Sequence, residues 1–403
     1  MLNRPAVGLP FRLVLTMAAA CGLAAASIYY NQPMLAGIAA SFGTSSASVV
    51  AIPTITQAGF AVGLVLLAPL GDRFERRRLC TMLALFLALA LFIAGVTQSF
   101  STLMVASLLI GIFATLAQQI VPLAAHLAEA GSRGRVVGLV MSGLLLGVLV
   151  GRVIAGAVAQ AFGWRMMFII GSASMIAVAA AIRALLPQSP PQHLLGFREL
   201  LCSLWPIARE EPVLRHAAAV GAFAYAGFGL FWSTLAIYLS GPPFSLGPAV
   251  SGLFGLVGIV GALAAPLAGR LADRENSRAA LRAGLLSLSS AFVVFAQFGG
   301  SILGLIAGVV LLDFGVQMVQ VTNQSAIFGL RPDARSRINT IYMATYFVGG
   351  TLGSTAASVA WKLGQWPMVC SVGLACSLVA LAIHLAAGPS QLRSRVERTS
   401  RSS

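Results

Sequence analysis

Charged residues are scarce in this chain, which has 403 residues of which 9% are charged and 58% are hydrophobic. Acidic residues are the rarer of the two charged classes: Asp and Glu together number only 11, against 26 Lys and Arg. A soluble domain of this size covers itself with charged side chains, whereas the mean hydropathy here is +0.90. The shortage of charge excludes a soluble globular protein and predicts an integral membrane protein that lies in the lipid bilayer.

Cysteine and histidine are also rare, with five and four residues scattered along the chain. Their positions give neither a disulfide framework nor the spacing of metal ligands. The sequence also lacks a phosphate-binding loop and a visible catalytic triad. We therefore predict no metal, no cofactor and no enzyme activity, and the chain itself gives no support to ATP-driven transport.

Apolar runs are abundant, and many reach the roughly 20 residues that a membrane-spanning helix needs. Short polar connections separate twelve such runs. They cover residues 11–35, 46–70, 79–97, 101–127, 136–160 and 165–186 in the first half, and 213–239, 248–269, 279–298, 300–328, 338–361 and 366–387 in the second. An even number of spans places both termini on the same side of the membrane.

The net charge of +15 is distributed in a way that orients the chain. With the N-terminus in the cytoplasm, the tails and the even-numbered connections hold 23 of the 26 Lys and Arg residues. Arg165 and Lys362 fall on the opposite side, and Arg152 falls inside a span. This is the positive-inside pattern. It predicts a multi-pass protein of the cytoplasmic membrane with both termini in the cytoplasm, and it makes a nucleic-acid partner unnecessary.

A charged turn occurs twice, at half the length of the chain. Residues 68–78 read Ala-Pro-Leu-Gly-Asp-Arg-Phe-Glu-Arg-Arg-Arg, and residues 269–274, which start 201 positions later, read Gly-Arg-Leu-Ala-Asp-Arg. A second block repeats at an offset of 202, with Gly147 over Gly349. Such a period predicts two similar helical bundles in tandem.

The repeat and the apolar runs together divide the chain into four parts. The predicted N-terminal six-helix bundle covers residues 1–186, and the C-terminal six-helix bundle covers 213–388. A cytoplasmic linker at 187–212 joins them and carries an amphipathic helix, in which apolar and charged residues alternate in the manner of a helix on the membrane surface. A basic cytoplasmic tail follows at 389–403.

The charged turn resembles the loop between the second and third spans of the major facilitator superfamily, whose pattern is roughly Gly-x-Leu-Ala-Asp-Arg-x-Gly-Arg-Arg. The chain departs from it where Ala68 and Glu75 replace the two glycines. The fifth predicted span resembles the antiporter motif of export carriers, with Arg152 in the place of its proline. Its seam of small residues, which is expected to lie between the halves, consists of Gly138, Gly147, Gly151 and Gly156.

This resemblance implies an all-α membrane protein of 12 transmembrane helices, arranged as two pseudo-twofold-related six-helix bundles with the substrate path between them. It also implies a latch on the cytoplasmic side that holds the outward-open state. Asp72 is expected to face the start of the eleventh span near Asn339, and Arg76 is expected to pair with Glu129. The expected latch residues are Asp72, Arg73, Arg76, Glu129, Asp273 and Arg274.

Two charges lie deep within predicted spans, Arg152 and Asp313. Burying such a group costs about 2.5–3.5 kcal/mol on the most lenient scale, so both are candidate functional residues. We propose them for proton coupling, in which Asp313 binds and releases a proton while access alternates. Two alternatives are open: the two residues form a static ion pair, or the Arg152 side chain reaches the outer surface.

Polar stripes along the predicted spans supply candidates for the substrate cavity. In the tenth span, Asp313, Gln317, Gln320 and Gln324 recur at helical spacing and share one face. The complete candidate set is Tyr30, Asn31, Gln57, Thr115, Gln118, Gln119, Tyr225, Trp232, Gln317, Gln320, Gln324, Tyr342 and Tyr346. The alternative for each is a hydrogen bond between helices, or core packing for the aromatic residues, without substrate contact.

The predicted function is secondary active transport, with export of small organic molecules by proton-coupled alternating access. The family branch resembled is that of bacterial arabinose-efflux and drug-efflux permeases. The expected partners are a small-molecule substrate, protons and the lipid bilayer, and the expected state is a monomer. Two alternatives are open: a proton-coupled importer of sugars or organic acids, and a membrane sensor without transport.

Overall fold

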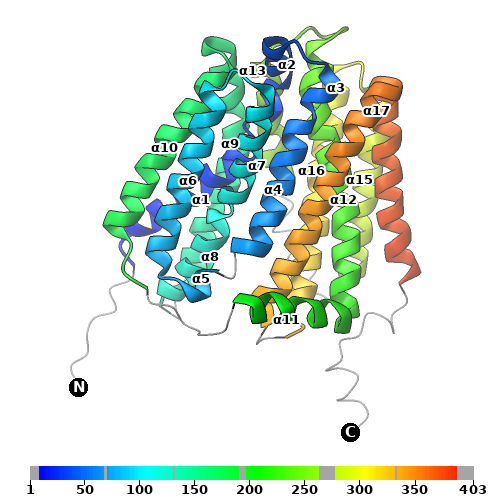
Figure 1. Ribbon diagram of the computed structural model, residues 1–403. Coiled ribbons are helices and arrows are strands. Elements are labelled where there is room, and N and C mark those ends of the chain that lie inside the picture. Colours follow the sequence, from blue (N-terminus) through cyan, green and yellow to red (C-terminus); the bar gives the residue numbers. More distant parts are fainter. Residues whose placement is uncertain are drawn as a thin grey trace, which may run out of the picture.

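The computed structural model of the protein describes residues 9–67, 70–129, 132–189, 197–262, 277–331 and 334–387, without the side chains of residues 72, 197–201, 259–262 and 336. All regular elements in these ranges are helices. They form an upright bundle in which α1 begins and α17 ends at the same end, the end at which α11 lies across the bundle (Figure 1). We call this end the α11 end and the opposite one the α2 end.

The first half of the chain forms six membrane-crossing segments. Their elements are α1 (Phe11–Ser27), η1 (Gln32–Met34), α2 (Leu35–Phe42), α3 (Ser46–Val49), α4 (Ala51–Leu67), α5 (Leu70–Arg73), α6 (Arg76–Val96), α7 (Phe100–Ala114), α8 (Leu116–Leu127), α9 (Arg133–Phe162) and α10 (Trp164–Leu185). The first segment, α1 with η1 and α2, runs to residue 42. It is longer than the predicted 11–35 because helical structure resumes after the Pro33 turn.

The second half follows the amphipathic helix of the linker. Its elements are α11 (Phe197–Glu210), α12 (Pro212–Ser240), α13 (Pro248–Ala262), α15 (Ser277–Phe298), α16 (Ile302–Phe328) and α17 (Arg335–Ala386). The long α17 contains two spans, because Gly364 and Gln365 leave the helical conformation in its middle, Gln365 with a positive φ of 49°. This break lies between the predicted eleventh and twelfth spans, 338–361 and 366–387.

Ten helices in the described part of the chain are long and apolar enough to cross a membrane. One of them is the broken α17, and the apolar α13 is a further, shorter helix. Counting both spans of α17 together with α13 confirms the twelve predicted spans. Helices are the expected structure inside a bilayer, because each backbone N–H and C=O must form its hydrogen bond within the segment.

The internal repeat is visible in the packing and in the helix caps. A Cβ atom on Gly147 of α9 would lie 2.4 Å from Gly22 Cα of α1, and one on Gly349 of α17 would lie 2.6 Å from Ala222 Cα of α12. Ser99 and Ser301, also 202 residues apart, cap α7 and α16 by accepting a backbone N–H three residues later. The same offset therefore relates sequence, helix ends and close helix contacts in the two halves.

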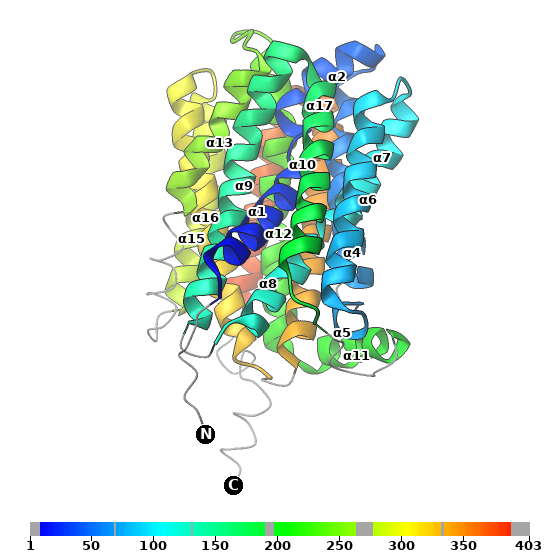
Figure 2. The same ribbon diagram turned by 90° about the vertical axis from the view of Figure 1, so that its left-hand side faces the viewer.

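The glycine seam of α9 lies between the halves, as predicted, only at Gly156. Figure 2 shows α9 between α1 and α13, with which it packs. Gly147 and Gly151 face α1 within the same half, whereas a Cβ on Gly156 would lie 2.3 Å from Pro248 O of α13 in the other half. Gly138 has no neighbour within 4 Å. Nine residues are two and a half helical turns, so Gly138 and Gly156 point away from the face of Gly147.

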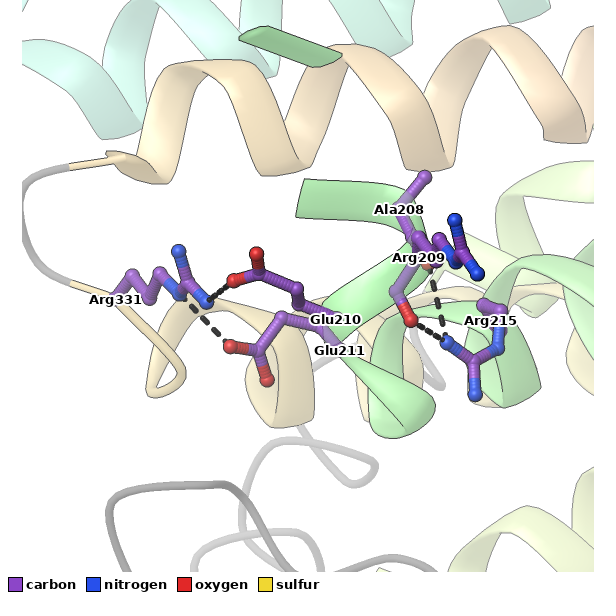
Figure 3. Close-up of polar contacts among 6 residues, drawn as sticks. All are labelled: Ala208, Arg209, Glu210, Glu211, Arg215 and Arg331. Carbon is purple, nitrogen blue, oxygen red and sulfur yellow. Dashed lines mark hydrogen bonds and ion pairs between the residues drawn. The ribbon is translucent and has the colours of Figure 1, made fainter. Parts of the chain in front are cut away.

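The helix α11 lies within the predicted linker and is tied to the second half. Arg331, which follows α16, donates to Glu210 Oε2 and to Glu211 Oε1, both at 2.8 Å (Figure 3). Arg215 of α12 donates to the carbonyl oxygens of Ala208 and Arg209 in the same region. Trp205 is 73% exposed, as expected for an aromatic side chain at the lipid headgroups.

The start of the linker is bonded to the other half through Glu75, the residue at which the chain departs from the family pattern. Its carboxylate caps α6 by accepting Arg77 N at 3.0 Å and Arg78 N at 2.8 Å, and it accepts Ser189 N at 3.1 Å. Partial burial acts to raise the pKa of Glu75, but these backbone donors and the Arg77 charge outweigh it, so the pKa lies below its ordinary value of 4.5. Where the family pattern has a glycine, this chain therefore has a side chain that caps α6.

We expect Glu75→Ala to destabilise the protein by roughly 1 kcal/mol at pH 7, because three N–H groups lose their acceptor. A lowered pKa means that the stabilisation is complete above pH 4.5 and is lost as the pH falls through the folded-state value. The melting midpoints of wild type and variant in detergent should therefore converge in acid. The exposed Glu129 provides a control, since Glu129→Ala should leave the midpoint unchanged. A gap that stays constant into acid would contradict this role of the Glu75 charge.

Candidate functional site

Hydrogen bonds join the two halves at mid-depth and toward the α2 end. Tyr29 and Tyr225 bring their hydroxyl oxygens to 3.0 Å, and Gln57 Nε2 donates to Ser354 Oγ at 3.1 Å. Closer to the α2 end, Ser358 donates to Ala47 O, and Gln160 Oε1 accepts Ala249 N at 3.2 Å. The halves thus meet through η1, α2, α3, α4 and α9 on one side and α12, α13 and α17 on the other.

Arg152 lies in this interface and is only 3% exposed, which rules out a side chain that reaches the surface. Its Nε donates to Gln32 Oε1 at 2.9 Å, and its Cζ lies 4.5 Å from the ring centre of Tyr29 and 4.2 Å from that of Trp232. These rings stabilise the charge through their negative faces. Nη2 is buried and has no hydrogen-bond partner.

Asp313 lies in the same interface and is 7% exposed, so it faces protein and not acyl chains. Its Oδ2 has no hydrogen-bond partner and lies 2.8 Å from the point that a Cβ on Gly258 would occupy. Such a Cβ on Gly255 would lie 3.1 Å from Arg152 Cβ. The two charges therefore rest against one helix, α13, where glycines three residues apart leave room for them.

Arg152 and Asp313 do not form the ion pair that the sequence analysis kept open. The ion pairs in the described part of the chain are those of Arg331. The two charges still affect each other electrostatically. Each charged group lies beside glycines of α13, and the guanidinium contacts Gln32 and the rings of Tyr29 and Trp232. This separation leaves one atom of each charged group without a partner.

A layer of aromatic side chains crosses the centre of the interface. Tyr225 stacks on Tyr346 with ring centres 4.0 Å apart, and the Tyr346 hydroxyl donates to Gln320 Oε1 at 3.5 Å. With the bond between Tyr29 and Tyr225, this layer reaches from the turn after α1 to α16. Gln320 is half-buried, as are the other predicted glutamines Gln118, Gln317 and Gln324. The aromatic layer thus adjoins polar side chains that are not fully packed.

Several predicted cavity residues serve other contacts. Tyr30 is buried where a Cβ on Gly151 or Gly171 would touch its ring, inside the first half. Asn31 donates to Thr56 at 3.2 Å, and Gln119 donates to Leu67 O at 2.7 Å beside the charged turn.

Two more predicted cavity residues are fully buried. Thr115 packs where a Cβ on Gly63 would lie 2.9 Å from its methyl carbon, and Tyr342 packs against Gly221. Sequence spacing alone does not distinguish residues that make such contacts between helices from residues that line a cavity.

The predicted latch is described only in part. Asp273, Arg274 and the side chain of Asp72 lie outside the described residues. The pairing of Arg76 with Glu129 is not formed in this conformation, because Arg76 Nε donates to Gly71 O at 3.1 Å and the Glu129 side chain is exposed. Arg73 is likewise exposed. The Gly71 carbonyl is close to Arg76 because both residues belong to the same charged turn.

A vestibule of about 260 Å³ opens between the halves near the α2 end. A second, water-sized cavity of about 10 Å³ lies between the vestibule and Arg152 and shares Pro33, Ala236 and Ser251 with it. Gln32 and Ser251 were not among the predicted site residues, and neither were the glycines of α13. The spacing Gly252, Gly255, Gly258 was a usable signal, because it places three small residues along one side of a helix.

Comparison with known proteins agrees with this architecture. The family profile of the Major Facilitator Superfamily matches residues 17–391. The "Putative uncharacterized transporter YgaY" of Escherichia coli K12 is 41% identical over 92% of this chain and 94% of its own length. The "Probable transporter SCO4007" of Streptomyces coelicolor is 33% identical over 91% of this chain and 85% of its own.

Solved structures share the fold at low sequence identity. A bacterial homolog of the human lysosomal transporter Spinster, in an inward-facing and occupied conformation, has a TM-score of 0.71 at 14% identity, with 92% of this chain and 95% of that chain covered. The human organic anion transporter MFSD10 (TETRAN) has a TM-score of 0.68 at 18% identity, with 93% and 99% covered. From its family profile, its relatives and its fold, this chain belongs to the Major Facilitator Superfamily and is a multi-pass membrane transporter.

Proposed function

We propose that the protein exports small organic molecules, such as drugs or metabolites, by proton-coupled alternating access. Asp313 carries the proposal. It is the one acidic residue within a predicted span, it is buried between the halves, and its Oδ2 has no partner. A carboxyl group in this position can take up a proton from one side and release it to the other as the halves rock.

The described hydrogen bonds between the halves lie away from the α11 end. Four such bonds are described, and they lie at mid-depth or toward the α2 end. The half-buried Gln324 of α16 lies closer to the α11 end. With the α11 end in the cytoplasm, as the basic residues predict, these bonds lie in the middle and outer parts of the membrane. Export then requires these bonds to break and the halves to part at the α2 end.

Flux measurements in proteoliposomes test the coupling and its direction. The substrate for this assay comes from a growth-inhibition and metabolite-export screen in a strain that lacks its own pumps. A pH gradient should drive accumulation of the substrate against the flow of protons, and a protonophore should abolish it. Liposomes without protein provide the control. Substrate that moves in the same direction as the proton would exclude the antiport mechanism, and absence of any flux would exclude transport.

A second candidate is proton-coupled import of organic acids. The buried guanidinium of Arg152 favours it, because Nη2 is unpaired and a carboxylate is a natural ligand for such a group. The same flux assay separates the two candidates by direction. Import is supported by uptake of an organic acid together with protons, and export is supported by exchange against them.

A further inference from the structure

We propose that Arg152, Gln32 and Ser251 form an anion-binding site that holds one monovalent anionic group at the water-sized cavity. The group is a small inorganic anion such as a halide, or the carboxylate of a transported substrate. The second source rests on the proposed transport function, whereas the first does not. Both share the same chemistry, which is a single negative charge that accepts hydrogen bonds from several donors.

The first observation is the unpaired charge of Arg152. The guanidinium is 3% exposed, no acidic residue in the described part of the chain forms an ion pair with it, and its Nη2 is buried without a partner. Its described hydrogen bond goes to a neutral amide oxygen, that of Gln32. A buried charge in this condition costs several kcal/mol unless a counter-charge joins it. The tertiary structure thus presents a buried cation that Asp313 influences from a distance but does not pair with.

The second observation is a cavity next to this cation that is lined by donors. Gln32, Arg152, Trp232 and Ser251 line the cavity of about 10 Å³, and no acidic residue is among the described residues that line it or the vestibule. The Gln32 amide uses its oxygen for Arg152 Nε, which leaves its NH₂ group as a donor. Ser251 is 5% exposed and supplies a hydroxyl group. An anion fits this combination better than a cation does.

The third observation is the access route. The small cavity shares three lining residues with the vestibule, so an anion can reach Arg152 from the α2 end. The rings of Tyr29 and Trp232 lie over the guanidinium and exclude water from it. Exclusion of water strengthens a charge-assisted hydrogen bond at the edge of the guanidinium. The available volume matches one water-sized ion, and a larger substrate needs the halves to part first.

Anion binding is tested on the purified full chain in detergent by its thermal stability. Sodium sulfate is replaced stepwise by sodium bromide at constant ionic strength, because sulfate is divalent and too large for the cavity. We expect bromide to raise the melting midpoint of the wild type in a saturable way. Ser251→Ala should weaken the apparent affinity roughly tenfold through loss of one hydrogen bond to a charge, and Arg152→Gln should abolish the effect.

The matched control is Arg165, whose Cζ also lies 4.2 Å from a tryptophan ring, that of Trp164, but which bonds to Thr97 O and Gln98. Arg165→Gln should keep the bromide effect. If the wild type shows no saturable effect, or if both Ser251→Ala and Arg152→Gln retain it in full, the site does not exist. The Ser251 variant keeps the test decisive even where Arg152→Gln fails to fold.

Formate, the smallest carboxylate, distinguishes the two sources. If formate competes with bromide in wild type, the site accepts a carboxylate, and the substrate class is an organic monoanion. If bromide binds and formate does not compete, the site holds an inorganic anion and the substrate class is not supported. The assay uses no gradient, so failure of anion binding leaves the proton-coupling proposal standing, and failure of coupled flux leaves the anion site standing.

Discussion

Replacement of Asp313 by asparagine is expected to reduce proton-driven accumulation in proteoliposomes to the background of empty liposomes. Asparagine has nearly the same volume and can still hydrogen-bond, but it cannot bind and release a proton in this pH range. Counterflow exchange, in which labelled and unlabelled substrate swap places, needs only the rocking of the halves. It should therefore persist, because the packing of Asp313 against Gly258 is retained. Both fluxes are measured with the same preparation.

Two further variants sharpen the Asp313 test. Asp313→Glu keeps a titratable group and should retain part of the driven flux. Glu397→Gln removes one carboxylate from the predicted cytoplasmic tail and should change nothing. If Asp313→Asn still accumulates substrate along a pH gradient at the wild-type rate, the proton-coupling role of Asp313 is wrong. If counterflow is lost as well, the residue is required for folding or for substrate binding.

The second large effect is expected for Gly147→Val in α9. A Cβ atom there would lie 2.1 Å from Gly22 O and 2.4 Å from Gly22 Cα, so α1 and α9 would have to separate along their contact. Overpacking of this kind typically costs about 1–3 kcal/mol or more, and here the clash is with backbone that cannot turn aside. We expect most of the variant to be lost from the monodisperse peak in size-exclusion chromatography, with a lowered melting midpoint for the remainder.

Gly138→Val is the matched control, since it makes the same substitution in the same helix and in the same sequence motif. Nothing lies within 4 Å of a Cβ at this position. The variant should fold as well as the wild type, to within about 0.5 kcal/mol, because surface substitutions are usually that mild. Equal loss of both variants would contradict the assignment of the α1 contact to Gly147, and would indicate a general need for glycine in α9.

Much of the architecture follows from regularities that are present along the chain. The twelve spans follow from apolar length, because a bilayer imposes one thickness on every segment. The 202-residue offset predicts equivalent contacts, and Gly147 and Gly349 make them against α1 and α12. The position of the helix break near residue 364 was also predictable, from the end of one apolar run and the start of the next.

The charged residues of the candidate site were predictable from the sequence, but the residues that contact them were not. Arg152 and Asp313 stand out in sequence as deep charges, and both are buried between the halves. An ion pair between them was the simplest expectation, but the guanidinium instead contacts Gln32, Tyr29 and Trp232. Polar residues such as Gln119 and Asn31 share the periodicity of cavity residues, but they bond to neighbouring helices.

The sequence by itself determined that this protein is a membrane protein of twelve helices in two related halves, with two deep charges. It did so because bilayer thickness and charge asymmetry act on each segment separately and leave their mark in its composition. Only the tertiary structure decided which helix each glycine of α9 faces, and which side chains surround Arg152. Those contacts depend on the rotation of each helix about its axis and on its neighbours, which packing between distant segments sets.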